Sequence, residues 1–161
     1  MTEMDLNMKM SANFTIREFI KSDTAMRRGI DNSPTEAHLE NALALFENVV
    51  QPVRDHFGPT ILTSGYRSEA LNAAIGGSPR SQHSKGQAVD LEVLGVSTAE
   101  VCEWIAANTD FDQLILEFYT PGDVNSGWVH VSYVKDGENR NETLTASKVN
   151  GVTEYAYGLN Y

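Results

Sequence analysis

Cysteine is almost absent from this sequence of 161 residues, in which only Cys102 is present. A single cysteine cannot form a disulfide within the chain, so the fold must be held together without one. The surrounding segment AEVCEWIAA has the apolar spacing of an amphipathic helix, which predicts a buried structural thiol. A chain of this length can bury on the order of 70% of its extended surface. The sequence therefore indicates an ordinary globular core.

Basic residues are also scarce. Lys and Arg number 12 against 22 Asp and Glu, which gives a formal net charge of −10 at pH 7. A nucleic-acid-binding protein needs a basic stripe on its surface, so this balance argues against nucleic acid as a partner. The same charge provides no general attraction to anionic membranes or to cell-wall polymers.

Long apolar runs are missing as well. No segment approaches the roughly 20 apolar residues that a membrane-spanning helix needs. The first residues, MTEMDLNMKMSAN, combine acidic side chains with no continuous apolar stretch, unlike a signal peptide or a membrane anchor. We expect residues 1–12 to form a disordered leader, and we expect synthesis in the cytoplasm without a signal peptide.

The apolar pattern predicts one α+β domain over residues 13–161. Between Thr35 and His56 apolar residues recur at steps of three and four, which is typical of an amphipathic helix. Pro52 predicts a kink or an early stop near the end of this helix. Strands are predicted within residues 61–68, 86–95, 113–118 and 128–133, with a further strand at 142–149. We expect a small antiparallel sheet that packs against helices.

Histidine occurs only four times in the sequence. His38 and His56 lie near the two ends of the long predicted helix, where a histidine is usually solvated or capping. His83 lies in the polar segment SQHSKGQAVD, in which Asp90 follows and Gly86 stands between the two. Gly86 would let this loop turn tightly enough to bring both side chains towards one ion. The segment is therefore a candidate for metal binding.

His130 is a polar residue inside the apolar strand segment GWVHVSYV. It is either a hydrogen-bonded core histidine or a third metal ligand. Catalytic zinc sites usually take three protein ligands from His, Asp or Glu and keep a further position for water. Such ligands often come from neighbouring strands, because alternation fixes which side chains share a face. We therefore predict a metal site formed by His83, Asp90 and His130.

The first candidate segment also matches a known signature. Ser81, His83, Gly86, Ala88 and Asp90 occupy its fixed positions, and the later WVH at 128–130 matches its second half. In these motifs the chain resembles the hedgehog/D-Ala-D-Ala zinc metallopeptidase superfamily. The segments FTIREFIKSDTAMRRGIDN, LTSGYRSEALNAAIGG and FDQLILEF are similar to its compact branch, which is common in phage and prophage genomes. The resemblance covers roughly residues 13–134.

The resemblance implies a function as well as a ligand set. It implies Zn²⁺ held by His83, Asp90 and His130, and cleavage of bacterial peptidoglycan stem peptides next to D-amino acids. The activity would be that of a D,D-carboxypeptidase or an LD-endopeptidase. The protein would then be a phage endolysin or a virion-associated lysin, acting on the cell wall or in the periplasm after release or as part of a virion. We expect it to be a monomer.

One position departs from the pattern of the superfamily. Many relatives place a catalytic Glu or Asp three residues before the last histidine, and here that position is Gly127. Glu117 is the best substitute for the missing general base, because pairing of 113–118 with 128–133 would bring it near His130. The alternative role for Glu117 is to orient a zinc-bound histidine. Weaker candidates for the base are Asp112, Asp123 and Glu92.

Three further residues are candidates for substrate contacts. Arg67, in the segment SGYRS, is expected to hold a substrate carboxylate or to stabilise the oxyanion formed during cleavage. Ser81 and Gln87 are expected to form hydrogen bonds with the substrate or with one of the metal ligands.

Two other functions compete with the peptidase. The missing carboxylate at Gly127 leaves open a non-catalytic zinc-binding module, such as a structural component of a phage tail. A serine hydrolase built on Ser81 and His83 is disfavoured, since the sequence has no nucleophile elbow and Asp90 is better explained as a ligand.

Overall fold

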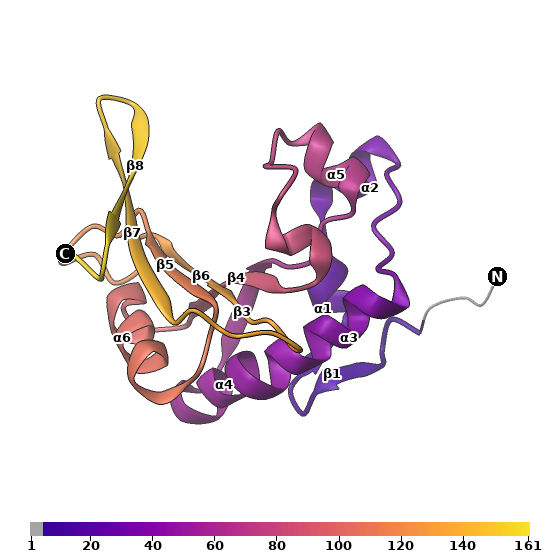
Figure 1. Ribbon diagram of the computed structural model, residues 1–161, viewed down its shortest axis with the longest axis horizontal. Helices are drawn as coiled ribbons and strands as arrows, with labels where there is room; N and C mark the ends of the chain where they lie inside the picture. The colour runs from indigo at the N-terminus through magenta and orange to yellow at the C-terminus, as the bar shows by residue number, and fades with distance from the viewer. Residues whose placement is uncertain (1–4) are drawn as a thin grey trace.

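Helices and strands are mixed along the chain, and together they form one α+β domain (Figure 1), which confirms the predicted fold class. The computed structural model describes residues 5–161. The strands are β1 (Lys9–Ser11), β2 (Phe14–Thr15), β3 (Thr60–Ser64), β4 (Ala88–Val93), β5 (Gln113–Glu117), β6 (Trp128–Ser132), β7 (Glu142–Val149) and β8 (Val152–Tyr157). The helical segments are α1 (Ile16–Ile20), α2 (Asp23–Arg28), α3 (Glu36–Leu45), η1 (Phe46–Val50), α4 (Gln51–Phe57), α5 (Glu69–Ala74), η2 (Gln82–Lys85) and α6 (Thr98–Asn108).

The main sheet has six strands in the order β3-β4-β6-β5-β7-β8, and β1 pairs separately with β2. The predicted hairpin of β5 and β6 is confirmed, and both β3–β4 and β4–β6 are antiparallel. One pair departs from the prediction, because β7 runs parallel to β5. The chain after β6 crosses to the start of β5, where the Asn141 N–H donates to the Phe111 carbonyl at 2.8 Å. The sheet is therefore mixed rather than purely antiparallel.

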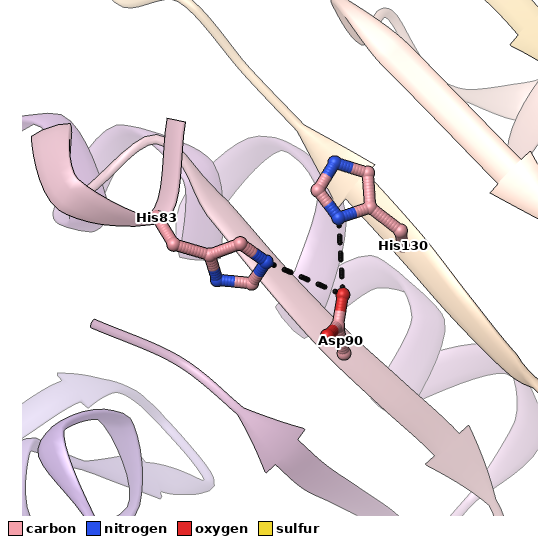
Figure 2. A group of neighbouring side chains, drawn as sticks. All are labelled: His83, Asp90 and His130. Carbon is pink, nitrogen blue, oxygen red and sulfur yellow. Dashed lines mark hydrogen bonds and ion pairs between the residues drawn. The ribbon is translucent and has the colours of Figure 1, made fainter. Parts of the chain in front are cut away.

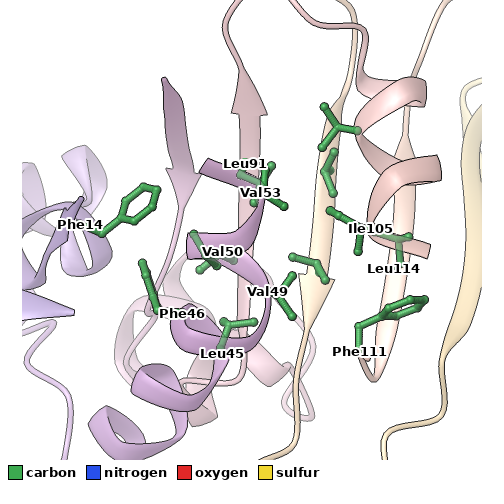
Figure 3. Packing of buried hydrophobic residues seen from close by; sticks show 14 of the residues in the cluster. Phe14, Leu45, Phe46, Val49, Val50, Val53, Leu91, Ile105, Phe111 and Leu114 are labelled. Atoms are coloured by element: carbon green, nitrogen blue, oxygen red, sulfur yellow. The ribbon is translucent and has the colours of Figure 1, made fainter. Parts of the chain in front are cut away.

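The hydrophobic core lies between one face of this sheet and the helices. Side chains from α3, η1 and α4 meet strand side chains that point to the same side, as Figure 3 shows for Val49, Val53 and Leu91. Alternation along the strands places Val89 and Leu91 on the core side and Asp90 on the opposite face. The polar residues of the sheet are thus collected on the face that the core leaves free.

Pro52 does not stop the long helix. Helical structure continues from α3 through η1 to Phe57, so the prediction of an early stop is wrong. The segment before Pro52 adopts a widened π-helical turn, in which the Gln51 N–H donates to the Phe46 carbonyl. A proline ring clashes with the carbonyl four residues earlier, and a widened turn is one way to relieve that clash.

The predicted leader is partly ordered. Lys9–Ser11 form β1, and Met10 is buried in the core at 5% exposure. The Ser11 hydroxyl donates to Oε1 of Gln51 at 2.6 Å, which ties β1 to the long helix. This part of the prediction of disorder is therefore corrected, because one apolar side chain reaches the core. Residues 1–4 lie outside the described part of the chain.

The C-terminal segment forms the far edge of the sheet. β7 confirms the predicted late strand, and β8 turns back to pair with it as a hairpin that rises from the body of the domain (Figure 1). Tyr155 and Tyr157 on β8 are exposed, whereas the hydroxyl of Tyr161 donates to Glu103 of α6. Over residues 5–161, no helix is long and apolar enough to cross a membrane.

Candidate metal centre

The sheet register brings two of the predicted ligands together. Asp90 of β4 and His130 of β6 are direct partners in the antiparallel ladder, so their side chains share one face. Nδ1 of His130 lies 3.0 Å from Oδ1 of Asp90. Residues 40 positions apart in the sequence are thus placed side by side by a single strand pairing.

The third predicted ligand comes from the short helical turn η2. The hydroxyl of Ser81 accepts a hydrogen bond from the His83 backbone N–H at 3.2 Å and caps this turn. Gly86 ends it with a φ of 72°, and a Cβ at this position would overlap the backbone carbonyl of His38. Glycine is therefore needed both for the left-handed backbone and for close packing on α3. This packing directs His83 towards β4.

The hydrogen bonding of His83 defines which ring nitrogen faces the site. Nδ1 lies 2.8 Å from the carbonyl oxygen of Gly65, and a carbonyl can only accept, so Nδ1 carries the proton. Burial lowers the pKa of His83, which keeps the ring neutral at pH 7. Its Nε2 lone pair then points at Oδ1 of Asp90, 3.4 Å away (Figure 2). Two facing acceptors of this kind suit a cation between them.

The donor set also fits zinc. One ligand atom from each of His83, Asp90 and His130 lies within 4.8 Å of the others. Burial alone would raise the pKa of Asp90, but the contact with His130 at 3.0 Å outweighs it and holds the pKa well below its usual range. The Asp90 carboxylate is therefore ionised at neutral pH. Two imidazole nitrogens and one carboxylate are a donor set typical of catalytic zinc.

Arg67 lies directly beside this group. Its Nη2 is 3.7 Å from Oδ2 of Asp90, and the same guanidinium donates to the Ser64 hydroxyl at 3.2 Å. The turn that carries Arg67 is anchored by Asn32, whose Oδ1 accepts from the Ser68 N–H at 2.7 Å and whose amide donates to the Tyr66 carbonyl at 3.0 Å. The guanidinium is thus fixed next to the predicted ligands.

A groove of about 480 Å³ opens over these side chains. Its walls combine the three predicted ligands with cationic, polar and aromatic residues from several separate parts of the chain. The lining residues are Arg67, Ser78, Arg80, Ser81, Gln82, His83, Asp90, Gln113, Ile115, Glu117, Trp128, His130, Arg140 and Tyr155. Among the predicted substrate contacts, Arg67 and Ser81 lie on the groove, and Gln87 is not among its lining residues. Oε1 of Gln87 instead accepts from Gln82 at 3.4 Å.

Glu117 reaches the same groove from β5. Its direct partner in the β5–β6 ladder is Trp128, and the partner of His130 is Ile115, so Glu117 lies diagonally from His130 on the shared face. Burial, and then the negative charge of Asp90, raise the pKa of Glu117 above its usual value, against opposing effects of His130, Trp128 and Arg67. A half-buried carboxylate with a raised pKa beside a candidate metal site is typical of a group used for proton transfer.

Gly127 has a structural reason to lack a side chain. Its φ is 68°, and a Cβ there would overlap the backbone oxygen of Glu117 and crowd the backbone of Phe118 and Tyr119. The end of β5 thus occupies the space that a carboxylate at position 127 would need.

Replacing Gly127 tests this packing. We expect Gly127→Ala to destabilise the fold by about 2 kcal/mol more than Gly122→Ala, because overpacking adds to the strain of positive φ. Gly122 is a matched control in the same loop, since it also has a positive φ of 88° but no atom of the described residues within 4 Å of its Cβ position. Urea unfolding of both variants measures the difference. Equal losses of unfolding free energy in the two variants would show that the backbone at the end of β5 shifts to accommodate the added Cβ without cost.

The weaker candidates for the general base lie elsewhere. Asp112 is bound by Arg140 at 2.8 Å and by Gln82 at 3.0 Å. Asp123 accepts from the Asn125 N–H at 3.1 Å in the exposed β5–β6 turn. Glu92 pairs with Ile61 on the outer part of β4. These three carboxylates are not among the lining residues of the groove, whereas Glu117 is.

The serine hydrolase alternative finds no support in the geometry. The Ser81 hydroxyl accepts from the backbone of His83, and both ring nitrogens of His83 face other groups, the Gly65 carbonyl and Asp90. Within the described residues, the ring of His83 thus has no hydrogen bond to Ser81 that would activate a nucleophile.

Comparison with known proteins agrees with the geometry. The sequence model of the Peptidase M15 family matches residues 12–132, which is well over half of the chain. The protein is a member of the Peptidase M15 family. M15 peptidases are zinc-dependent, and the His83–Asp90–His130 group could bind a metal ion, so the predicted superfamily and the predicted cofactor are both confirmed. Membership implies zinc peptidase activity on peptidoglycan. No curated protein matches the sequence significantly.

Sequence reasoning missed part of the groove of this M15 peptidase. Arg80, Arg140 and Tyr155 line it together with the predicted site residues. Arg140 and Tyr155 lie beyond the family match, in a polar tail whose sequence carries no motif. No local pattern marks these residues, because only the parallel pairing of β7 with β5 brings the tail to the groove.

Proposed function

We propose that this protein cleaves peptidoglycan stem peptides next to D-amino acids, with His83, Asp90 and His130 as zinc ligands, Glu117 as general base and Arg67 as substrate clamp. The observation that carries the proposal is that these five side chains line one groove in a chain of the M15 family. Among the groove's acidic residues, Glu117 is the one left for proton transfer once Asp90 serves as a ligand.

Each residue has a defined part in the reaction. Zinc, when bound, supplies a Lewis acid that polarises the scissile carbonyl and lowers the pKa of water from about 15.7 toward 7. Glu117 takes a proton from the attacking water and passes it to the leaving amine. Its raised pKa favours both transfers, because the carboxyl then gains and loses a proton nearer to neutrality. Arg67 donates to a carboxylate or to the carbonyl oxygen of the substrate.

The shape around Arg67 favours an endopeptidase over a carboxypeptidase. Arg67 also lines a second cavity of about 340 Å³, formed with Lys21, Tyr66 and residues of β3, α2 and α5. Arg67 therefore borders two cavities, and a peptide held at its guanidinium has space in each of them. An endopeptidase needs room for peptide on both sides of the cut bond, and a carboxypeptidase needs much less on one side. We accordingly propose a role as an endolysin or virion-associated lysin acting on the cell wall.

Digestion of purified peptidoglycan tests the proposed activity. We expect cleavage by the zinc-loaded protein, loss of cleavage in the presence of a chelator, and recovery when zinc is added back. Mass spectrometry of the products identifies the bond, since an endopeptidase releases peptide fragments and a carboxypeptidase releases a single terminal amino acid. Digestion that persists after complete removal of metal would contradict a metallopeptidase.

Because position 127 has no carboxylate, a second candidate function remains, that of a non-catalytic zinc-binding structural module. The two candidates differ in a simple measurement. A structural module would bind zinc and leave peptidoglycan intact, whereas the proposed peptidase would bind zinc and cleave peptidoglycan.

A further inference from the structure

The part of the chain beyond the family match forms one wall of the groove. The match ends at residue 132, and β7 and β8 follow it. Arg140, just before β7, and Tyr155 of β8 both line the groove that holds the metal-binding group. The hairpin of β7 and β8 stands beside β5 at this edge of the sheet (Figure 1). Residues outside the M15 match thus face the same groove as the reacting groups.

Arg140 is held in place by a buried carboxylate. Its Nε and Nη2 donate to the two oxygens of Asp112 at 3.0 and 2.8 Å, and its backbone N–H donates to Oδ1 at 3.2 Å. Asp112 is only 5% exposed, and Gln82 also donates to it at 3.0 Å. A guanidinium fixed by such a bidentate contact loses little conformational entropy when it binds a further partner.

Arg140 keeps donors free for another group. Its Nη1 lies 3.8 Å from Oε1 of Glu142, which is beyond hydrogen-bond distance, and its side chain is 53% exposed. Since Nε and one proton of Nη2 are used by Asp112, the Nη1 protons and the second Nη2 proton remain available. A carboxylate at the groove edge could accept from them.

The remaining charges of the groove favour an anionic ligand. Arg67, Arg80 and Arg140 line it, although the whole chain has a net charge of −10. The acidic lining residues are Asp90 and Glu117, and both belong to the metal-binding and proton-transfer groups. Outside that centre the charged lining residues are basic, although the charge of Arg140 is partly neutralised by Asp112 behind it and by Glu142 nearby.

We infer that Arg140 forms a carboxylate-binding subsite, bordered by Tyr155, which selects stem peptides that carry a free carboxylate away from the bond being cut. This inference rests on the proposed function, because it assigns a specificity to the same groove. Arg140 is a specificity-determining residue, separate from the clamp at Arg67.

Two synthetic stem peptides test the subsite. One carries a free carboxylate on its D-glutamate and diaminopimelate residues, and in the other these carboxylates are amidated. We expect the wild-type protein to favour the free carboxylates by about 10-fold in kcat/KM, with most of the effect in KM, because Arg140 is partly solvated. Arg140→Gln should lose this preference and cleave the amidated peptide as well as wild type. Arg17→Gln, which removes the same charge from exposed α1, should retain it.

A second variant and a binding measurement separate the subsite from a structural role. Arg140→Gln leaves Asp112 without its cation, so Arg140→Lys, which keeps the charge, should show an intermediate preference. A purely structural role would reduce cleavage of both peptides equally, and this outcome would overturn the inference. Binding of both peptides to the His83→Ala variant, followed by tryptophan fluorescence, gives the preference without catalysis. A retained preference with no cleavage by wild type would support the subsite while contradicting the proposed peptidase.

Discussion

Glu117→Gln is expected to lower peptidoglycan cleavage by roughly 100- to 10,000-fold while the protein still binds zinc, because general acid–base catalysis typically contributes that much. Glutamine keeps the shape of the side chain, but it cannot take a proton from water. Release of soluble peptide from purified peptidoglycan measures the rate, and zinc content is measured on the same samples. Glu92→Gln is the matched control, since Glu92 lies on the same sheet outside the groove.

The same variant should be at least as stable as wild type. Burial raises the pKa of Glu117 in the folded state above its value in the unfolded chain. The ionised carboxylate therefore lowers the stability of the zinc-free fold once the pH exceeds the unfolded pKa, and the loss is complete above the folded pKa. Glutamine removes this charge, so the free energy of unfolding at pH 7 should hold or rise. Catalytic residues commonly reduce stability in this way.

Two outcomes would change the role of Glu117. Undiminished cleavage by Glu117→Gln would show that the general base lies elsewhere. Loss of zinc together with cleavage would instead support the alternative in which Glu117 orients a zinc-bound histidine.

His83→Ala is expected to abolish cleavage and to weaken zinc binding. Loss of a residue that only hydrogen-bonds to a metal ligand typically weakens metal binding by roughly 10- to 100-fold, and loss of a ligand itself should weaken it by more. The variant removes one of three donor atoms and leaves the Gly65 carbonyl without its imidazole donor. Competition with a chromophoric chelator measures the affinity. Zinc should also raise the Tm of wild type but not of this variant, since a ligand stabilises only the state that binds it.

His56→Ala provides the matched control for the metal site. His56 is on α4 and stacks on Trp104 with ring centroids 4.7 Å apart. The His56→Ala substitution therefore removes an imidazole that lies outside the candidate metal site. We expect zinc binding and cleavage to be retained in this variant. Stoichiometric, tightly bound zinc in His83→Ala would show that the metal site lies at other residues.

The sequence alone predicted the residues that meet at the candidate metal centre, because their signals are local. His83, Gly86 and Asp90 lie within one short loop and strand, and the left-handed backbone of Gly86 follows from the glycine itself. His130 stood out because strand alternation makes a polar residue conspicuous among apolar neighbours. The β5–β6 hairpin was predictable for a similar reason, since two apolar segments flank a turn-rich one.

Other features depend on contacts that leave no local pattern. The residue before Pro52 could have ended the helix, but burial of Val49, Val50 and Val53 keeps the segment helical through a widened turn. Met10 similarly orders part of a polar N-terminal segment through one buried side chain. In both cases tertiary packing outweighs the local preference.

The sequence determined the type of chemistry, since residue identity and spacing fix which donors a loop and a strand can offer one ion. Only the tertiary structure decided what surrounds those donors. In the fold, the backbone at the end of β5 fills the space beside Gly127, and Glu117 lines the groove. The parallel pairing of β7 with β5 brings Arg140 to the same groove. These placements depend on strand order, which is set by the burial of many side chains together and not by any short segment.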